Sequence, residues 1–273
     1  MRSFDKEIKA MVFCRDSPRH VYFANTIGKH VQVDSLVVQL SPPFWNRFRK
    51  LKTIKRKINE LWKYFRKNIL GVTKKEKEYF FGKKDCSFHN KEIINYCHNI
   101  NEGAVVDLVR EKSPDLILTF GCGILKNNIF FDLPKFGIIN LHSGITPKYR
   151  GVDNVYWCMH NKDMNNIGLT VHFVNKEIDM GEIISQIKIS HDLKTDNEIS
   201  LFNRVIRRGI EEFVEVLKKI KKGEKVKSAK IINRGRLYQE KDRTILSDIR
   251  TFINMREVKK EHKSRKYGRQ QTF

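Results

Sequence analysis

The sequence has few of the features that mark secreted or membrane proteins. Five cysteines occur among 273 residues, at irregular spacing and without a Cys-x-x-Cys pair, which argues against a disulfide framework and for reduced thiols. Residues 1–7 contain no apolar run of the kind that a signal peptide needs. No uncharged apolar stretch reaches the roughly 18 residues that a membrane-spanning helix requires. These absences predict a cytoplasmic location.

Glycine is missing where a nucleotide-binding sheet needs it. The first strand is expected at residues 8–14, and Arg15-Asp16-Ser17-Pro18-Arg19 follows it. A dinucleotide fold needs glycines at this turn to bring the backbone close to the pyrophosphate. No Walker A sequence occurs, and the later Gly121-Cys122-Gly123 is a single Gly-x-Gly. The sequence therefore argues against a dinucleotide- or P-loop-binding protein.

Acidic residues are scarce in three stretches only. The chain has 54 basic and 31 acidic residues, a formal net charge of +23. Residues 47–67, 218–236 and 256–273 hold 26 basic and 4 acidic residues, so these 58 residues carry +22 and the other 215 carry +1. A nearly neutral body with basic appendages is weaker evidence for nucleic-acid binding than a basic groove. We therefore do not expect nucleic acid as the main partner.

Strands and helices alternate along most of the chain. Strands are expected at residues 8–14, 33–40, 115–120, 137–141, 168–174 and 183–189. Helices are expected at residues 19–29, 104–112, 125–131, 152–161 and 198–220. This alternation, in a chain with 40% hydrophobic residues, predicts an α/β fold with a Rossmann-like, mainly parallel sheet.

The chain is expected to divide into two unequal parts. Residues 1–222 would form the catalytic domain, with a basic helical insertion at about residues 44–70. Residues 223–273 would form a small C-terminal appendage, with a strand or two, a helix near residues 245–255 and a basic polar tail.

Polar side chains gather where one apolar strand ends. Asn140 and His142 close the strand expected at residues 137–141, and residues i and i+2 of a strand share a face. Both can therefore point into a cleft at the carboxyl end of the sheet, where open α/β sheets bind ligands. An amide donor beside an imidazole suits the oxyanion of an acyl transfer, and Asp179, in a turn, is the candidate carboxylate that supports the imidazole. A structural histidine remains the alternative at this point.

Residues 114–186 strongly resemble the folate-dependent formyltransferase family, and weaker resemblance extends over about two thirds of the chain. The resemblance rests on an ordered series of motifs: Asp115-Leu-Ile-Leu-Thr-Phe-Gly, Ile124-Leu125, Asn140-Leu-His142-Ser, Pro147-Lys-Tyr-Arg-Gly151, Gly168-Leu-Thr-Val-His172 and Asp179-x-Gly181-x-Ile-Ile-x-Gln186. An ordered series is more specific than any single motif.

The resemblance implies a reaction as well as a fold. Asn140 and protonated His142 would stabilise the oxyanion while an acceptor amine attacks the formyl carbon, and Asp179 would support His142 and help remove the amine proton. The donor would be 10-formyltetrahydrofolate, and no metal would be needed. Its pterin would lie against two segments: Gly121, Cys122, Gly123, Ile124 and Leu125, and the loop with Ile178 and Asp179.

Departures from the family pattern reduce the number of acceptors that the resemblance allows. Glycinamide ribonucleotide enzymes have a glycine-rich phosphate loop where this chain has Arg15-Asp16-Ser17-Pro18. Methionyl-tRNA enzymes have an early Gly-Thr-Pro turn and a C-terminal barrel too large for residues 223–273. The resemblance is therefore nearest to the nucleotide-sugar enzymes, which implies a nucleotide-linked amino sugar as acceptor and, by analogy, a homodimer. Two alternatives remain: a methionyl-tRNA formyltransferase-like enzyme, and an inactive scaffold that binds RNA or membrane through basic arms.

Four residues beyond the catalytic strand are expected to contact the acceptor: Ser143, Lys148, Tyr149 and Arg150. The alternative for Tyr149 and Arg150 is that they brace the loop. Neither Cys86-x-x-His89 nor Cys97-His98 has the spacing of common zinc ligands, so we expect no metal site. His172, on the strand with Thr170, is expected to be a supporting residue.

Residues 44–70 show apolar residues at helical spacing with a basic opposite face, after a plausible start at Ser41-Pro42-Pro43. Three interpretations remain open: a helix packed over the catalytic sheet, an interfacial membrane helix, and an RNA-contacting arm. The packed helix is the default expectation, and peripheral membrane contact is the next. The aromatic residues that favour the membrane are Trp45, Phe48, Trp62 and Phe65.

Overall fold

The computed structural model describes the backbone of residues 8–270 and the side chains of residues 8–262. Residues 1–7, on which the expected lack of a signal peptide rests, lie outside the described residues, as do residues 271–273 at the end of the predicted tail. Within residues 8–270, no helix combines the length and the apolar character needed to cross a membrane.

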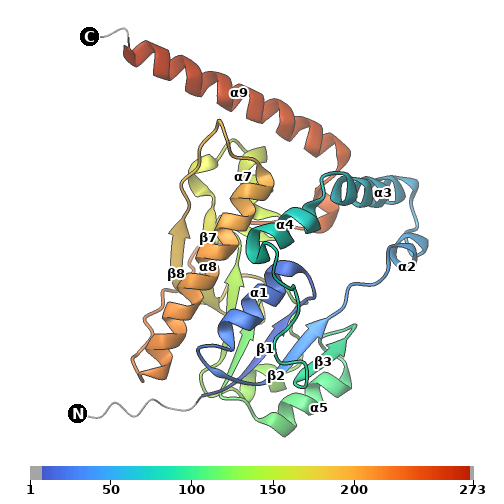
Figure 1. The fold of residues 1–273 in the computed structure, drawn as a ribbon, viewed down its shortest axis with the longest axis vertical. Coiled ribbons are helices and arrows are strands. Elements are labelled where there is room, and N and C mark those ends of the chain that lie inside the picture. Colours follow the sequence, from blue (N-terminus) through green and yellow to red (C-terminus); the bar gives the residue numbers. More distant parts are fainter. Residues whose placement is uncertain (1–7, 271–273) are drawn as a thin grey trace.

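A seven-stranded sheet lies at the centre of the molecule, in the order β3-β2-β1-β4-β5-β7-β8 (Figure 1). Five neighbouring strands run parallel: β3 (Ile94–Cys97), β2 (Gln32–Gln39), β1 (Lys9–Cys14), β4 (Leu116–Thr119) and β5 (Ile138–His142). β7 (Gly168–Phe173) and β8 (Ile183–Lys188) continue the sheet antiparallel. The prediction of a Rossmann-like, mainly parallel α/β sheet is confirmed.

Helices cover both faces of the sheet, and the alternation of side chains on β1 shows why. Val12 and Cys14 belong to one hydrophobic cluster, whereas Met11 and Phe13 belong to another. α1 (Pro18–Ile27), α4 (Val72–Phe81) and α8 (Glu198–Lys221) pack over the first cluster, and α5 (Gly103–Lys112) and α6 (Ile129–Asp132) over the second. A parallel strand that is apolar on both faces is stable only with cover on both sides.

The chain after residue 222 returns to the loop that follows β5. β9 (Arg236–Tyr238) pairs in parallel with β6 (Tyr149–Gly151), and α9 (Ile245–Gln270) packs against α7 (Asn154–His160). Two short 3-10 turns, Met164–Asn166 and Glu240–Asp242, complete this region. The helix expected at residues 245–255 is longer than expected, because residues 256–267 contain no glycine or proline and are rich in lysine, arginine and glutamate, which favour helix.

The segment at residues 44–70 forms two helices instead of the one expected. α2 (Phe44–Arg49) begins directly after Pro43, as expected, and α3 (Ile54–Ile69) begins after a short break. The break ends at Thr53, whose extended backbone (φ −115°, ψ 145°) and side-chain hydroxyl, accepting from the Arg56 N–H, form a helix N-cap.

Candidate active site

A pocket of about 570 Å³ opens at the carboxyl ends of β1, β4 and β5. It lies where the strand order reverses, the usual ligand position in open α/β sheets. The predicted catalytic residues and most of the predicted binding residues line it together: Asn140, His142, Asp179, Gly121, Cys122, Gly123, Ile124, Leu125, Ile178 and Ser143. Residues far apart in the sequence therefore meet in one cavity.

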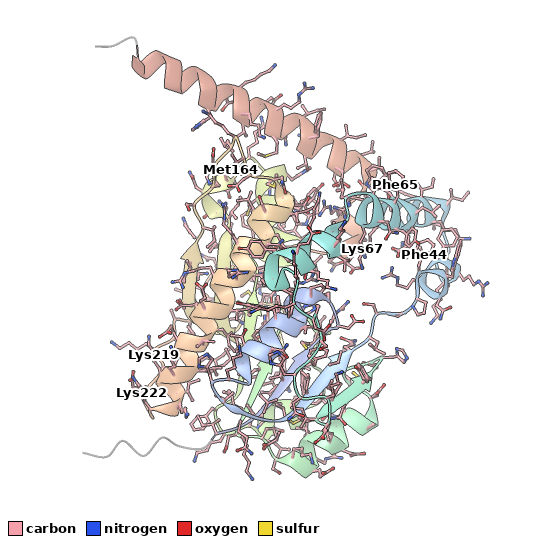
Figure 2. The ribbon with its side chains drawn as sticks, viewed as in Figure 1. Phe44, Phe65, Lys67, Met164, Lys219 and Lys222 are labelled. Atoms are coloured by element: carbon pink, nitrogen blue, oxygen red, sulfur yellow. The ribbon has the colours of Figure 1, made fainter. Side chains whose placement is uncertain are left out.

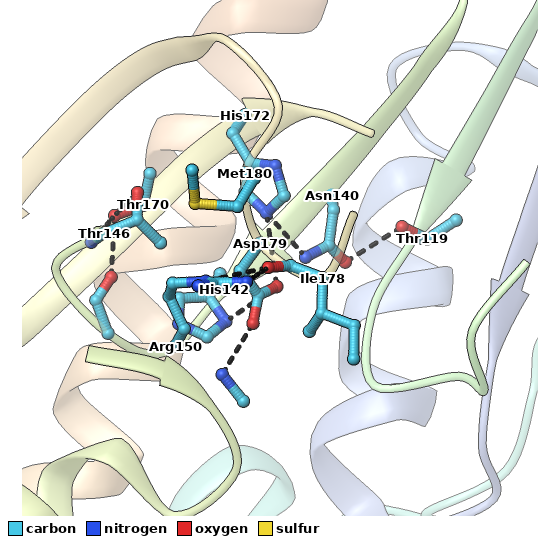
Figure 3. Close-up of polar contacts among 12 residues, drawn as sticks. Thr119, Asn140, His142, Thr146, Arg150, Thr170, His172, Ile178, Asp179 and Met180 are labelled. Carbon is cyan, nitrogen blue, oxygen red and sulfur yellow. Dashed lines mark hydrogen bonds and ion pairs between the residues drawn. The ribbon is translucent and has the colours of Figure 1, made fainter. Parts of the chain in front are cut away.

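The amide of Asn140 is held in one orientation (Figure 3). Thr119 Oγ1 donates to Asn140 Oδ1 at 2.9 Å, and Asn140 Nδ2 lies 3.1 Å from His172 Nε2. His172 Nδ1 is 2.6 Å from the Phe173 carbonyl oxygen, so Nδ1 carries the proton and Nε2 accepts from Asn140. The second Nδ2 hydrogen of Asn140 has no protein partner among the described residues and can be donated into the pocket.

The imidazole of His142 lies between two acceptors. His142 Nε2 is 2.9 Å from the Tyr149 carbonyl oxygen, and His142 Nδ1 is 3.4 Å from Asp179 Oδ1. Asn154 Nδ2 also lies 3.1 Å from His142 Nε2, so Nε2 faces an acceptor and a donor while Nδ1 faces the carboxylate. Burial lowers the pKa of His142 below its ordinary value, and the charge of Asp179 offsets only part of this shift.

Asp179 lies in the turn before β8, with left-handed backbone (φ 51°). Its Oδ2 accepts from the Gly151 N–H at 2.7 Å. Burial alone raises the pKa of this carboxyl, but the charge of His142 and the hydrogen bond from the Gly151 N–H hold the pKa well below its ordinary value. Asp179 is therefore an anion that faces His142.

Two contacts fix the position of the turn that contains Asp179. The guanidinium of Arg150 donates to the Ile178 carbonyl oxygen from Nε at 2.9 Å and from Nη2 at 2.7 Å. At Gly181 a Cβ would lie 1.6 Å from the Phe173 carbonyl oxygen, so only glycine allows the turn to approach β7 this closely. The Asp-x-Gly spacing thus has a structural reason.

Polar side chains of neighbouring segments hold the backbone of residues 121–125 in place. Gln39 Oε1 accepts from the Gly123 N–H at 2.7 Å, and Asn101 Nδ2 donates to the Ile124 carbonyl oxygen at 2.9 Å. Gly121 has φ 67°, and a Cβ there would lie 2.5 Å from His20 Nε2. The loop therefore offers a preformed backbone wall to the pocket.

Lys148, Tyr149 and Arg150 are not among the residues that line the pocket, and their expected contact with the acceptor stays a prediction. Tyr149 is buried, with its ring stacked on Tyr238 and its hydroxyl donating to Asp163 at 2.8 Å. Lys148 pairs with the same carboxylate at 2.6 Å, and Arg150 points to Ile178. The contacts of Tyr149 and Arg150 agree with the alternative that these two residues brace the loop. Ser143 alone of the four lines the pocket.

Two arginines in the pocket were missed. Arg15 lies in the turn after β1 and Arg19 in the first turn of α1, a segment in which the sequence predicted only the lack of a glycine loop. Arg19 Nη1 pairs with Glu76 at 2.9 Å. Arg15 Nη1 donates to Ser41 at 3.3 Å, and its buried Nε has no partner among the described residues. Their position at the carboxyl end of a strand was the available signal.

No group of three or more histidine, cysteine, aspartate or glutamate side chains that could hold a metal ion occurs in the described part of the chain. Cys86 and Cys97 are free thiols, and burial raises the pKa of both.

A family model for formyl transferases matches residues 66–217. This match covers more than half of the chain and contains all the motifs at residues 114–186. The chain belongs to the formyl transferase family, and the prediction of that family is confirmed.

Curated relatives match about half of the chain. The chain is 33% identical over 130 residues to the bifunctional polymyxin resistance protein ArnA of Wigglesworthia glossinidia brevipalpis, an alignment that covers 48% of this chain and 20% of that protein. It is 30% identical over 143 residues to methionyl-tRNA formyltransferase of Fusobacterium nucleatum, which covers 52% of this chain and 45% of that protein. It is 34% identical over 111 residues to GDP-perosamine N-formyltransferase of Brucella melitensis (41% and 42%). The alignments thus span less than half the length of these relatives.

Solved structures share the fold over most of the chain. A 4-N formyltransferase from Francisella tularensis superposes with a TM-score of 0.58 at 18% identity, covering 92% of this chain and 88% of that one. A sugar N-formyltransferase from Shewanella gives a TM-score of 0.57 at 15% identity, with the same coverage. At such identities the likeness shows a common fold.

Proposed function

We propose that the protein transfers a formyl group from 10-formyltetrahydrofolate to the primary amine of a nucleotide-linked amino sugar. The single observation that carries the proposal is the convergence of Asn140, His142 and Asp179 on one pocket, with an amide N–H free to donate and an imidazole paired with a carboxylate. These are the parts that a transfer to an amine needs: donors for a developing oxyanion and a group that takes a proton.

The lining of the pocket fits the donor. The loop of residues 121–125 supplies backbone groups, and Leu125, Val174 and Ile178 supply apolar side chains on either side of the cavity. A flat heterocycle with polar edges is recognised by this combination, and about 570 Å³ lies within the range of small-molecule sites. When bound, 10-formyltetrahydrofolate supplies an electrophilic formyl carbon attached to nitrogen.

The mechanism follows from the fixed orientations in the site. Asn140 donates its free Nδ2 hydrogen to the formyl oxygen, and His142 presents its positive charge to the same oxygen as the amine adds. Asp179 orients His142 and favours its charged form against the effect of burial, and with His142 it takes part in moving the proton that the amine loses to the nitrogen that leaves. A new carbon–nitrogen bond forms to the acceptor, and the bond to the donor nitrogen breaks.

The proposed acceptor rests on two observations. One curated relative is named GDP-perosamine N-formyltransferase, and it is 34% identical over 111 residues. In addition, Arg15 and Arg19 place two guanidinium groups on the pocket wall, and guanidinium is a strong donor to phosphate. An amine on a sugar that carries a diphosphate would agree with the name of this relative, and its phosphates would bind the two arginines.

Methionyl-tRNA is the second candidate acceptor, because methionyl-tRNA formyltransferases also match, at 30% identity over 143 residues in the protein from Fusobacterium nucleatum. The test is incubation with 10-formyltetrahydrofolate and a panel of nucleotide amino sugars, with initiator methionyl-tRNA alongside, and mass spectrometry of the products. We expect a formylated nucleotide sugar. Formylation of the tRNA alone would show that the proposed acceptor is wrong.

The arginines give a finer test on the same assay. We expect Arg15→Gln to raise the KM of the acceptor by roughly tenfold with little change in kcat, because it removes one phosphate donor from the wall. Arg110→Gln, an exposed arginine on α5, is the matched control. An unchanged acceptor KM in Arg15→Gln would contradict the phosphate contact.

A further inference from the structure

The apolar stripe of α3 faces away from the protein. Ile54, Ile58, Leu61, Phe65 and Ile69 are spaced by four, three, four and four residues, so they share one face of the helix. Each side chain is between 45% and 78% exposed, and no residue of α3 is buried. α3 lies at the outer edge of the molecule (Figure 1), and Figure 2 shows its Phe65 and Lys67 beside the start of α9.

The polar side of the same helix holds it on the protein. The indole Nε1 of Trp62 donates to Asp248 Oδ2 at 2.7 Å, and Arg66 Nε lies 3.7 Å from the same carboxylate oxygen. Lys63 Nζ pairs with Glu240 at 3.0 Å. A surface helix normally buries its apolar stripe and exposes its polar side. α3 does the reverse, so the default expectation of a helix packed by its apolar face over the sheet is wrong.

Neighbouring helices add exposed apolar side chains to this region. α2 is joined to α3 by the rings of Phe44 and Tyr64, 4.5 Å apart, and exposes Trp45. α9, which supplies Asp248, exposes four apolar side chains: Leu246, Ile249, Phe252 and Ile253. Clustered exposed apolar side chains of this number mark an interaction surface.

The surface is strongly cationic. Residues 47–67 hold ten basic residues and one acidic residue, Glu60, which pairs with Arg47 at 2.9 Å. Lys63 and Arg66 are paired to the C-terminal region. The other seven have no ion-pair partner among the described residues: Arg49, Lys50, Lys52, Lys55, Arg56, Lys57 and Lys67.

We propose that α2 and α3 dock this enzyme on an anionic lipid bilayer, with the apolar stripe of α3 at the boundary of the acyl chains and the unpaired cations at the level of the lipid phosphates. An amphipathic helix with aromatic and aliphatic residues on one side and lysine and arginine around them binds such interfaces. The stripe and the cations are both available without any rearrangement, because the helix is already held by its other side.

The chemistry of this surface favours an anionic bilayer over two other partners, a second copy of the chain and RNA. A second copy of the chain, seated on the same face, would bring two sets of seven unpaired cations together, and their repulsion opposes the contact. RNA would satisfy the cations, but aliphatic side chains such as Ile54, Ile58 and Leu61 offer nothing to bases or phosphates. Of these three partners, the anionic bilayer alone uses both the charge and the stripe.

The docking surface is separate from the catalytic pocket, since none of residues 44–70 lines it. The proposal therefore does not depend on which amine is formylated. Enzyme activity also provides a check on folding, because a variant of the stripe leaves the pocket lining intact.

The test is flotation of the full chain with two kinds of vesicle, phosphatidylcholine alone and phosphatidylcholine with phosphatidylglycerol. The variant carries Ile54→Ser, Ile58→Ser and Leu61→Ser, three exposed positions whose loss should leave Tm unchanged. The matched control is Ile232→Ser, which removes an apolar side chain that is 91% exposed outside α3. Sedimentation velocity without lipid reports the oligomeric state of each protein.

We expect the wild-type chain and the control to float with the anionic vesicles only, and the triple variant to bind them at least about tenfold more weakly. Three results would overturn the proposal. The first is no flotation of the wild type. The second is flotation that the triple variant retains, which would show attraction by charge alone. The third is a lipid-free dimer, or a complex with a single-stranded RNA, that forms in preference to vesicle binding.

Discussion

Asn140 and His172 face each other across the antiparallel pair of β5 and β7, with Asn140 Nδ2 lying 3.1 Å from His172 Nε2. The two residues are register partners in the sheet, so the contact is set by the backbone. Because His172 accepts one hydrogen of the amide, the other is directed to the pocket. A histidine that the sequence marked only as a supporting residue thus determines the direction in which the proposed oxyanion donor points.

Removal of His172 should therefore slow the reaction without weakening binding of the donor. We expect His172→Ala to lower kcat about 10- to 100-fold with the donor KM within roughly twofold of wild type, since the amide of Asn140 loses its orientation. Steady-state kinetics of the variant measure this, with His98→Ala, an exposed histidine, as control. An unchanged kcat would show that Thr119 alone orients the amide.

Arg150 should act on the turn with Asp179 and not on the acceptor. Arg150 is 8% exposed, and its guanidinium makes two hydrogen bonds to the Ile178 carbonyl oxygen, which a lysine cannot reproduce. We expect Arg150→Lys to lower kcat at least about tenfold and leave the acceptor KM unchanged. A raised acceptor KM with a normal kcat would instead support the contact between Arg150 and the acceptor that the sequence predicted.

The low pKa of Asp179 links stability to pH. The carboxyl has a lower pKa in the folded protein than in the unfolded chain, so protonation favours unfolding. Its contribution to the free energy of unfolding, about 1–3 kcal/mol, is complete above the unfolded value of roughly 3.9 and is lost as the pH falls through the lower folded value.

Thermal melts from pH 7 down to about pH 2 test this link, because most of the contribution is lost below the unfolded pKa. Asp179→Asn should have a lower Tm than wild type at pH 7 and should lose less Tm than wild type on acidification. Asp107→Asn, on the exposed side of α5, is the control and should follow the wild type. If Asp179→Asn shows the same fall in Tm with pH as wild type, the carboxylate does not contribute as described.

Strong local patterns made most of the fold and the centre of the site predictable. β4 reads Leu-Ile-Leu-Thr and β5 starts with Ile-Ile, and the positions of Asn140 and His142 two residues apart predict a common direction. β3 was not predicted, because Ile94–Cys97 is four residues long and contains the polar Asn95. α4 was not predicted either, because seven of its ten residues carry charge or hydroxyl groups and only Phe80 and Glu76 are buried.

The direction of side chains outside the main sheet was not predictable. Lys148, Tyr149 and Arg150 follow the catalytic strand closely, yet the loop turns them toward Asp163 and Ile178. In α3, the spacing of apolar residues predicts a helix and its two faces, but which face meets the protein depends on distant partners such as Asp248. The homodimer and the cytoplasmic location stay predictions.

Formyl transfer by His142→Ala tests the central claim most directly. The measurement is the rate of product formation from 10-formyltetrahydrofolate and the acceptor that the wild-type enzyme uses, with Tm as evidence that the variant is folded. Because His142 supplies the charge that faces the developing oxyanion, the account predicts a loss of at least about a thousandfold in kcat in a folded protein. Near-normal transfer by His142→Ala would contradict it.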